Sequence, residues 1–191
     1  MFGHNRRLMT KSLAALLVGV ASLSCGSSGT TGTTGTVDDA LSRGLQAHAA
    51  GKVDEATTAY FETLAKDPNN KFAFYNLGVI AQGQNRVAAA EAYYRLALEQ
   101  DAKLTSALFN LAILRNIAGA NQEAADLYRR VTAAEPNNAA AHFNLGLVLR
   151  LLGQTAEAQT ELATAQRLDA KLVAPSPSAS PARQASPSPT R

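Results

Sequence analysis

The apolar positions in the middle of the chain repeat with a period of 34 residues. An aromatic residue, Asn, Leu and a small residue follow one another at residues 75–78, 109–112 and 143–146. The core-facing positions of one unit fall at i, i+3, i+4 and i+7, which is the spacing of one helix face. A second run with helical spacing follows a Gly or Asn, the residue types that best tolerate the left-handed conformation ending a helix. Each unit is therefore predicted to be a helix, a tight turn and a second helix.

Four units can be aligned, over residues 37–70, 71–104, 105–138 and 139–172. Two columns of small residues support this register, namely Gly44, Gly78, Ala112 and Gly146, and Ala56, Ala90, Ala124 and Ala158. Two helices joined by a short turn must pass closely, and a large side chain between them would push them apart. Because one unit cannot bury its own apolar faces, the four are expected to stack into an all-α solenoid of about eight helices.

The period and the columns of small and aromatic residues resemble the tetratricopeptide repeat, over residues 37–172. The chain departs from that family at the seventh position of the first unit, where Arg43 stands instead of Leu. It also has no Trp at the fourth position of any unit. The resemblance implies an α-solenoid of four helix-turn-helix repeats, whose first helices line a concave groove that holds an extended peptide.

The resemblance places the second, fifth, sixth, ninth and twelfth residues of each unit on that groove. The predicted peptide-binding residues are Tyr75, Asn76, Val79, Phe109, Asn110, Ile113, Phe143, Asn144, Leu147 and Arg150. An Asn amide offers both a donor and an acceptor to a peptide backbone, and the aromatic rows would accept its side chains. In the alternative, the Asn residues satisfy helix ends and the aromatic residues pack between units. Arg150 is the one Lys or Arg in these rows, which disfavours the version of the family that clamps a terminal carboxylate.

Residues 1–24 are predicted to be a signal peptide for export. A basic start with Arg6, Arg7 and Lys11 is followed by an apolar run at residues 13–23. That run of eleven residues is shorter than the ~20 that a membrane-spanning helix needs. A permanent transmembrane helix is therefore the weaker interpretation.

Residues 22–25, Ser-Leu-Ser-Cys, resemble the lipobox of bacterial lipoproteins, although Ser22 stands where that family usually has Leu. The resemblance implies that Cys25 is lipid-modified, becomes the N-terminus and anchors the protein to a membrane. Residues 26–36 are only Gly, Ser and Thr, so residues 25–36 are predicted to be a flexible tether. The alternative is a soluble secreted or periplasmic protein that is cut nearby.

Residues 173–191 hold five of the seven prolines among Ser and Ala, and they are predicted to be a disordered tail. The solenoid is thus expected to lie between disordered N- and C-terminal segments. The net charge of +3 comes from these ends, because residues 37–172 hold 13 basic and 15 acidic residues. With no basic stripe on the repeats, nucleic-acid binding is not expected.

No catalytic motif is present, and only His48 and His142 remain after removal of the signal. His142 holds an inter-helix packing position, which favours a structural role. A single cysteine excludes an intramolecular disulfide and a zinc site built on cysteines. We therefore expect no enzyme activity, no cofactor and no metal.

Together these patterns predict a non-catalytic scaffold or assembly factor at the bacterial cell envelope, which binds a protein or peptide partner in the groove. The alternative is a structural spacer or a self-associating envelope protein without a separate ligand. In that case the groove would hold a second copy or the proline-rich tail, so a homo-oligomer stays open. The identity of the partner and the membrane concerned are not encoded in any of these patterns.

Overall fold

The computed structural model describes residues 35–172, and within them it has eight helices and no strand. The helices are α1 (Val37–Ala49), α2 (Val53–Lys66), α3 (Lys71–Gly83), α4 (Val87–Gln100), α5 (Thr105–Ile117), α6 (Asn121–Ala134), α7 (Ala139–Leu151) and α8 (Thr155–Leu168). This confirms the predicted all-α solenoid. The signal peptide, Cys25, nearly all of the predicted tether and the tail at residues 173–191 lie outside the described residues.

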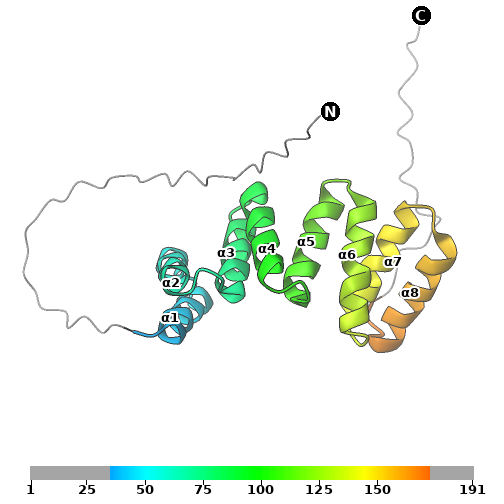
Figure 1. The fold of residues 1–191 in the computed structure, drawn as a ribbon. Coiled ribbons are helices and arrows are strands. Elements are labelled where there is room, and N and C mark those ends of the chain that lie inside the picture. The colour runs from blue at the N-terminus through cyan, green and yellow to red at the C-terminus, as the bar shows by residue number, and fades with distance from the viewer. Residues whose placement is uncertain (1–34, 173–191) are drawn as a thin grey trace, which may run out of the picture. The chain divides into compact units, whose positions relative to one another are not determined.

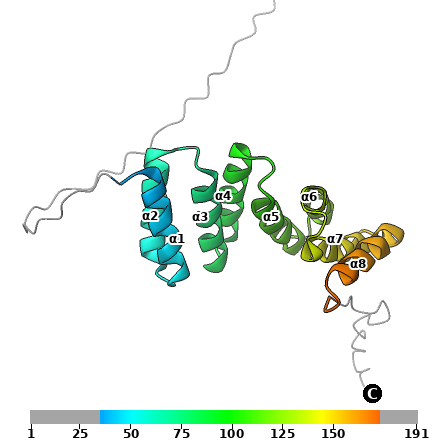
Figure 2. The ribbon, with the colours of Figure 1, turned by 90° about the horizontal axis from the view of Figure 1, so that it is seen from below.

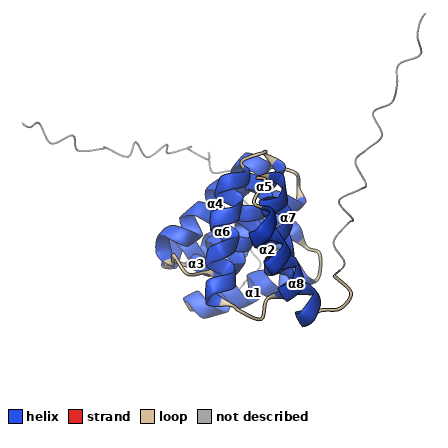
Figure 3. Ribbon diagram, turned by 90° about the vertical axis from the view of Figure 1, so that its right-hand side faces the viewer, coloured by secondary structure: helices blue, strands red, loops and turns tan. Residues whose placement is uncertain are grey.

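Each repeat contains one helix pair, and each helix packs against its neighbours in the sequence. Figures 1 and 2 show the pairs following one another in a row, from α1 in blue to α8 in orange. Short loops join the helices (Figure 3). Of the helices that the structure describes, none is long and apolar enough to cross a membrane.

The turn inside each repeat has the left-handed residue that its sequence predicts. Gly51, Gly119 and Gly153 have φ angles of 73°, 77° and 76°, and Asn85 has a φ of 57°. Because Gly has no Cβ, it adopts this conformation without a steric penalty, and Asn is the residue that tolerates it next best. These turns bring the second helix of each repeat back along the first.

Small residues allow the two helices of a repeat to approach closely. A Cβ added to Gly78 would lie 2.6 Å from Cε1 of Tyr94, and one added to Gly44 would lie 2.5 Å from Cε1 of Tyr60. The rings of Tyr60, Tyr94 and Tyr128 are almost fully buried and fill the centre of the first three repeats. In the first two repeats, therefore, the ring of the second helix occupies the space that the glycine of the first helix leaves.

Loops between repeats begin some of the first helices with a side-chain cap. Asn70 accepts a hydrogen bond from the backbone N–H of Ala73 at 3.0 Å, and Asn138 accepts one from Ala141 at 3.0 Å. These bonds satisfy one of the four N–H groups that a helix start leaves without an intrahelical partner. The register of α3 and α7 along the row is thus fixed in part by local sequence.

Candidate functional site

The ten predicted groove residues lie on α3, α5 and α7, and all but Arg150 form sets of three at equivalent positions, one repeat apart. Each of them is half-buried, so none is enclosed in the core and none stands fully in solvent. Tyr75, Val79, Phe109 and Ile113 pack against the core along one side. Positions two, five, six, nine, twelve and thirteen of a first helix fall on one side of it, and we call this side of α1, α3, α5 and α7 the groove face.

A cavity of about 350 Å³ opens on the groove face between α3, α5 and α7. It brings together three of the predicted residues, Tyr75, Phe109 and Asn110. The remaining lining residues are Thr105, Ser106, Glu135, Asn138 and Ala140. Ser106 and Ala140 hold the second position of their repeats, which the family pattern places in the groove, so this part of the lining could be found from the sequence.

Hydrogen bonds to Glu135 hold one edge of this cavity in place. The Thr105 hydroxyl donates to the Glu135 carboxylate, and the Asn138 amide donates to it at 2.8 Å. These two bonds hold the pKa of Glu135 below its usual value, because they stabilise the ionised form. No sequence pattern indicated a place in the groove for this side chain, since Glu135 lies in a loop after α6.

The Asn side chains of the groove are not equivalent to one another. The Asn76 amide donates to the backbone oxygen of Phe72, one turn earlier, at 2.7 Å. The Asn110 amide donates to the hydroxyl groups of Tyr75 at 3.4 Å and of Tyr94 at 3.3 Å. Asn110 therefore ties the second repeat to the third, whereas Asn76 bonds only within its own helix.

The groove face extends beyond the ten predicted residues. Six large apolar side chains of the described part are exposed, and four of them lie on first helices: Leu45, Phe72, Ile117 and Leu151. Ile117 and Leu151 are the most exposed, at 75% and 66%. They occupy the thirteenth position of their repeats, four residues after Ile113 and Leu147, and so share a helix face with them. The family pattern that guided the prediction stops at the twelfth position, which is why they were missed.

Few charged residues stand in the rows that the family pattern assigns to the groove. Asp38 on α1 and Arg150 on α7 are the two ionised side chains at the second, fifth, sixth, ninth and twelfth positions of the repeats. On α3 and α5 these positions carry only aromatic, aliphatic, amide and hydroxyl side chains. The face thus favours uncharged ligands.

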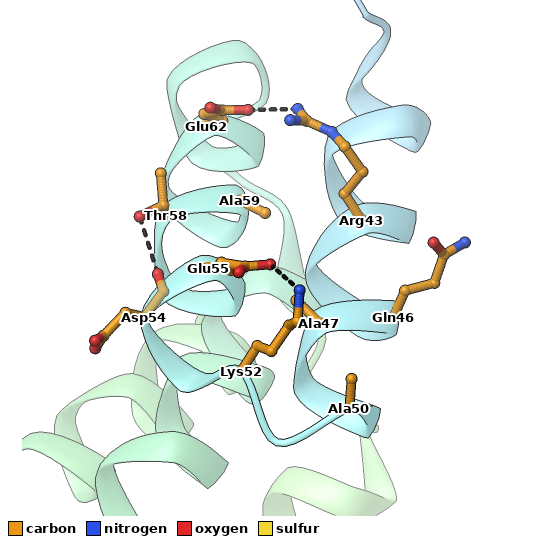
Figure 4. Close-up of a pocket in the computed structure, with 10 residues that line it drawn as sticks. All are labelled: Arg43, Gln46, Ala47, Ala50, Lys52, Asp54, Glu55, Thr58, Ala59 and Glu62. Carbon is orange, nitrogen blue, oxygen red and sulfur yellow. Dashed lines mark hydrogen bonds and ion pairs between the residues drawn. The ribbon is translucent and has the colours of Figure 1, made fainter.

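A larger cavity, of about 670 Å³, lies on the first repeat (Figure 4). Most of the residues that line it are polar or charged, and two ion pairs lie among them. Arg43 of α1 reaches Glu62 of α2 at 2.5 Å, and Lys52 pairs with Glu55 at 3.1 Å. Buried leucines stand at the position of Arg43 in the later repeats, Leu77, Leu111 and Leu145, because the preceding repeat covers them. The cavity thus lies on the end face of the helix row, which no other described repeat covers, and Arg43 is the polar residue that such an end face needs in place of Leu.

The described residues show no arrangement that points to chemistry. Among residues 35–172 no group of three or more His, Cys, Asp or Glu side chains is placed to hold a metal ion. His142 is half-buried, with Nδ1 2.5 Å from Glu161 Oε2 and Nε2 3.0 Å from the Pro136 carbonyl. These contacts join α7, α8 and the loop before α7, which suits a structural role.

Two family models match the chain, and both describe the tetratricopeptide repeat, one over residues 41–104 and the other over residues 127–160. The helix pairs, their turns and these matches establish the class: the chain belongs to the tetratricopeptide repeat family. Proteins of this family are generally non-catalytic scaffolds for protein–protein contacts. No curated protein sequence matches the chain significantly.

Several solved structures share the fold. MamA is 20% identical, with a TM-score of 0.63, over 71% of this chain and 79% of that one. PilF of Pseudomonas aeruginosa is 24% identical, with a TM-score of 0.62, over 70% of this chain and 61% of that one. The first tetratricopeptide domain of Spaghetti (RPAP3), bound to the HSP90 peptide SRMEEVD, is 26% identical, with a TM-score of 0.57, over 62% and 94% of the two chains.

Proposed function

We propose that this protein is a non-catalytic scaffold that holds an extended segment of a partner protein on the groove face. The observation that carries this proposal is the placement of its exposed apolar side chains. Four of the six large ones lie on first helices, and three of these helices, α3, α5 and α7, also line the cavity of about 350 Å³. Clustered exposed apolar side chains mark interaction sites, whereas single ones are ordinary.

The partner segment is uncharged and rich in apolar side chains. The peptide held by the RPAP3 domain contains two Glu and one Asp, so it calls for cationic side chains in its groove. In this chain Arg150 is the one Lys or Arg in the rows of the groove, and α3 and α5 contribute none to them. An acidic terminal peptide would lose its hydration there without gaining ion pairs.

The scaffold acts at the bacterial cell envelope, exported by residues 1–24 and anchored by lipid on Cys25. This part of the proposal is supported by the basic start, the short apolar run and the Ser-Leu-Ser-Cys motif. Incorporation of a labelled fatty acid into the wild-type chain, and its loss in Cys25→Ser, would be the expected result. A chain that is exported without label would instead be the soluble secreted or periplasmic form.

Affinity capture from native envelopes tests the groove. We expect the wild-type chain to capture a specific partner and Ile117→Ser/Leu151→Ser to lose most of it, because this variant removes the two most exposed apolar side chains of the groove face. Both residues are more than half exposed, so their replacement should leave helicity unchanged. Circular dichroism checks this.

Phe61→Ser is the matched control, since Phe61 is 50% exposed but lies on α2, a second helix. Capture that survives in Ile117→Ser/Leu151→Ser and is lost in Phe61→Ser would move the binding surface to the second helices. A chain that captures only copies of itself would favour the rival function, a self-associating spacer.

A further inference from the structure

The end of α8 directs the chain toward the groove face. In the first two repeats the loop after the second helix has the same hydrogen bonds, with the N–H of Asn69 donating to Asp67 and that of Lys103 donating to Asp101. The loop after α8 repeats them, since the N–H of Lys171 donates to the Asp169 carboxylate at 3.0 Å and that of Leu172 donates to the Asp169 carbonyl at 3.0 Å.

The earlier loops of this kind lead directly into the next first helix. The chain therefore leaves Leu172 where a fifth first helix would begin, at the end of the row that α1, α3, α5 and α7 form. Residues 173–191 follow this point. Their starting position is the end of the groove face itself.

The composition of residues 173–191 suits that face better than it suits a helix. Five prolines in 19 residues oppose helix formation and favour the polyproline II conformation. At 3.1 Å per residue, such a segment spans roughly 60 Å. The first helices follow one another along the row, so a segment of this length can reach more than one of them.

The groove face has the side chains that bind proline-rich segments. Aromatic grooves accept polyproline II ligands because the flat rings pack against the proline rings, and the stiff ligand loses little entropy. Phe72, Tyr75, Phe109 and Phe143 supply such rings along the row, and all are half-buried or exposed. Residues 173–191 contain no Asp or Glu and only two Arg, Arg183 and Arg191, so most of their side chains are uncharged, as the groove face favours.

We propose that residues 173–191 bind along the groove face of their own chain and compete there with the partner. This inference rests on the proposed function, because the same face is occupied in both cases. A segment tethered to the end of the row has an effective concentration of about 1 mM or above, so weak contacts suffice to hold it. A groove filled for about nine-tenths of the time would bind its partner about tenfold more weakly.

Paramagnetic relaxation tests the intramolecular contact in the full chain. A nitroxide on Ala182→Cys, in a Cys25→Ser background, should broaden the amide signals of Ile113, Ile117, Leu147 and Leu151. Broadening should be lost in Ile117→Ser/Leu151→Ser and kept in the Phe61→Ser control. A spin-labelled chain mixed with a separate isotope-labelled chain should give no broadening at low concentration.

Signals of the groove face that stay sharp, or broadening that is uniform over all helices, would overturn the inference. Broadening seen only between separate chains would also overturn it and would assign the face to a second copy. Replacing the five prolines by Ala should raise partner capture severalfold. If the nitroxide shows no contact but partner capture still depends on Ile117 and Leu151, only this inference fails. If the nitroxide shows the contact but neither the wild-type chain nor any variant captures a partner, the proposed function fails.

Discussion

Tyr60 and Tyr94 hold the same place in successive repeats, but their hydroxyl groups have different surroundings. The Tyr94 hydroxyl donates to Gln82 Oε1 at 2.6 Å and accepts from the Asn110 amide at 3.3 Å. The Tyr60 hydroxyl is buried without a hydrogen-bond partner among the described residues. Asn76 is to Tyr60 what Asn110 is to Tyr94, the Asn of the following repeat. Its amide, however, donates to the backbone oxygen of Phe72 and not to the tyrosine. Equivalent tyrosines in two successive repeats thus have different hydrogen bonds.

Replacing these tyrosines by Phe should have unequal effects on the free energy of unfolding. Tyr94→Phe should lower it by about 1–2 kcal/mol, because Gln82 and Asn110 lose their shared partner. Tyr60→Phe should leave it unchanged or raise it by up to about 1 kcal/mol, because an unpaired buried hydroxyl is removed. Urea unfolding of both variants measures the difference. Equal losses would mean that Tyr60 has a partner after all.

The two glycines of α3, Gly78 and Gly83, differ in the space that surrounds them. A methyl group on Gly78 would meet the ring of Tyr94 at 2.6 Å, whereas one on Gly83 would meet nothing within 4 Å. The third repeat carries Ala112 at the position of Gly78, so we expect the helices to move apart and accommodate the methyl group. That movement costs about 1–3 kcal/mol.

Gly83→Ala is the matched control, and it should raise the free energy of unfolding by roughly 0.5–1 kcal/mol, since Ala loses less backbone entropy in a helix. Thermal unfolding followed by circular dichroism would show the two melting temperatures moving in opposite directions. A Gly78→Ala variant as stable as the wild type would show that α3 and α4 are not held at a fixed distance.

The first repeat shows how an element's position in the row decides the role of its residues. Arg43, Gln46 and Glu62 lie on its open end face. One repeat later the corresponding residues are Leu77, Ile80 and Leu96, of which Leu77 and Ile80 are buried. A terminal repeat needs a polar outer face for solubility, and these three residues supply it.

Giving the first repeat the residues of the second should make chains associate end to end. In Arg43→Leu/Gln46→Ile/Glu62→Leu the open face becomes apolar, and we expect dimers or larger species at micromolar concentration, detected by light scattering after gel filtration. A variant with three apolar substitutions on scattered exposed positions, Glu99→Leu/Gln122→Ile/Gln159→Leu, should stay as the wild type. Association of both variants would mean that added hydrophobicity alone is responsible.

The row as a whole is held by contacts between neighbouring repeats. Arg95 pairs with Glu123 at 3.1 Å, and Arg129 pairs with Glu157 at 3.0 Å, which is the same contact one repeat later. At the first junction the corresponding residues are Phe61 and Ala89, so this ion pair is missing there. Because each repeat contacts only its neighbours, we expect the first junction to open more readily than the later two.

Alkaline pH should destabilise the whole row through its buried tyrosines. Burial raises the pKa of Tyr60 to about 12 and also raises the pKa values of Tyr94 and Tyr128, because the phenolate loses its hydration. In the unfolded chain these groups ionise near pH 10. Their contribution to stability is complete below pH 10 and is lost as the pH rises toward about 12, since only the unfolded state releases the protons.

Urea unfolding at a series of pH values up to about 11 measures this loss. In Tyr60→Phe, which keeps the other hydrogen bonds, the fall in stability above pH 10 should be smaller than in the wild type. A wild-type curve that is flat across this range would show that the three hydroxyls are accessible to water.

The sequence alone determined the helices, the turns and the close approach of the two helices in a repeat. The physical reason is that these features depend on residues near in the chain: helical spacing, a left-handed Gly or Asn, and small residues in columns. The family pattern also assigns positions within one unit to a groove, and peptide binding at these positions stays a prediction. The ten predicted groove residues all lie on the groove face, half-buried.

Only the tertiary structure decided what equivalent residues do in different repeats. Asn76 and Asn110 hold the same position, yet one bonds its own helix and the other joins two repeats. Arg43 stands in a leucine column because no described repeat covers it, and Ile117 and Leu151 stay exposed because no later segment of residues 35–172 reaches them. Such differences arise from the neighbours that a repeat meets in space, and a pattern shared by all four repeats does not contain them.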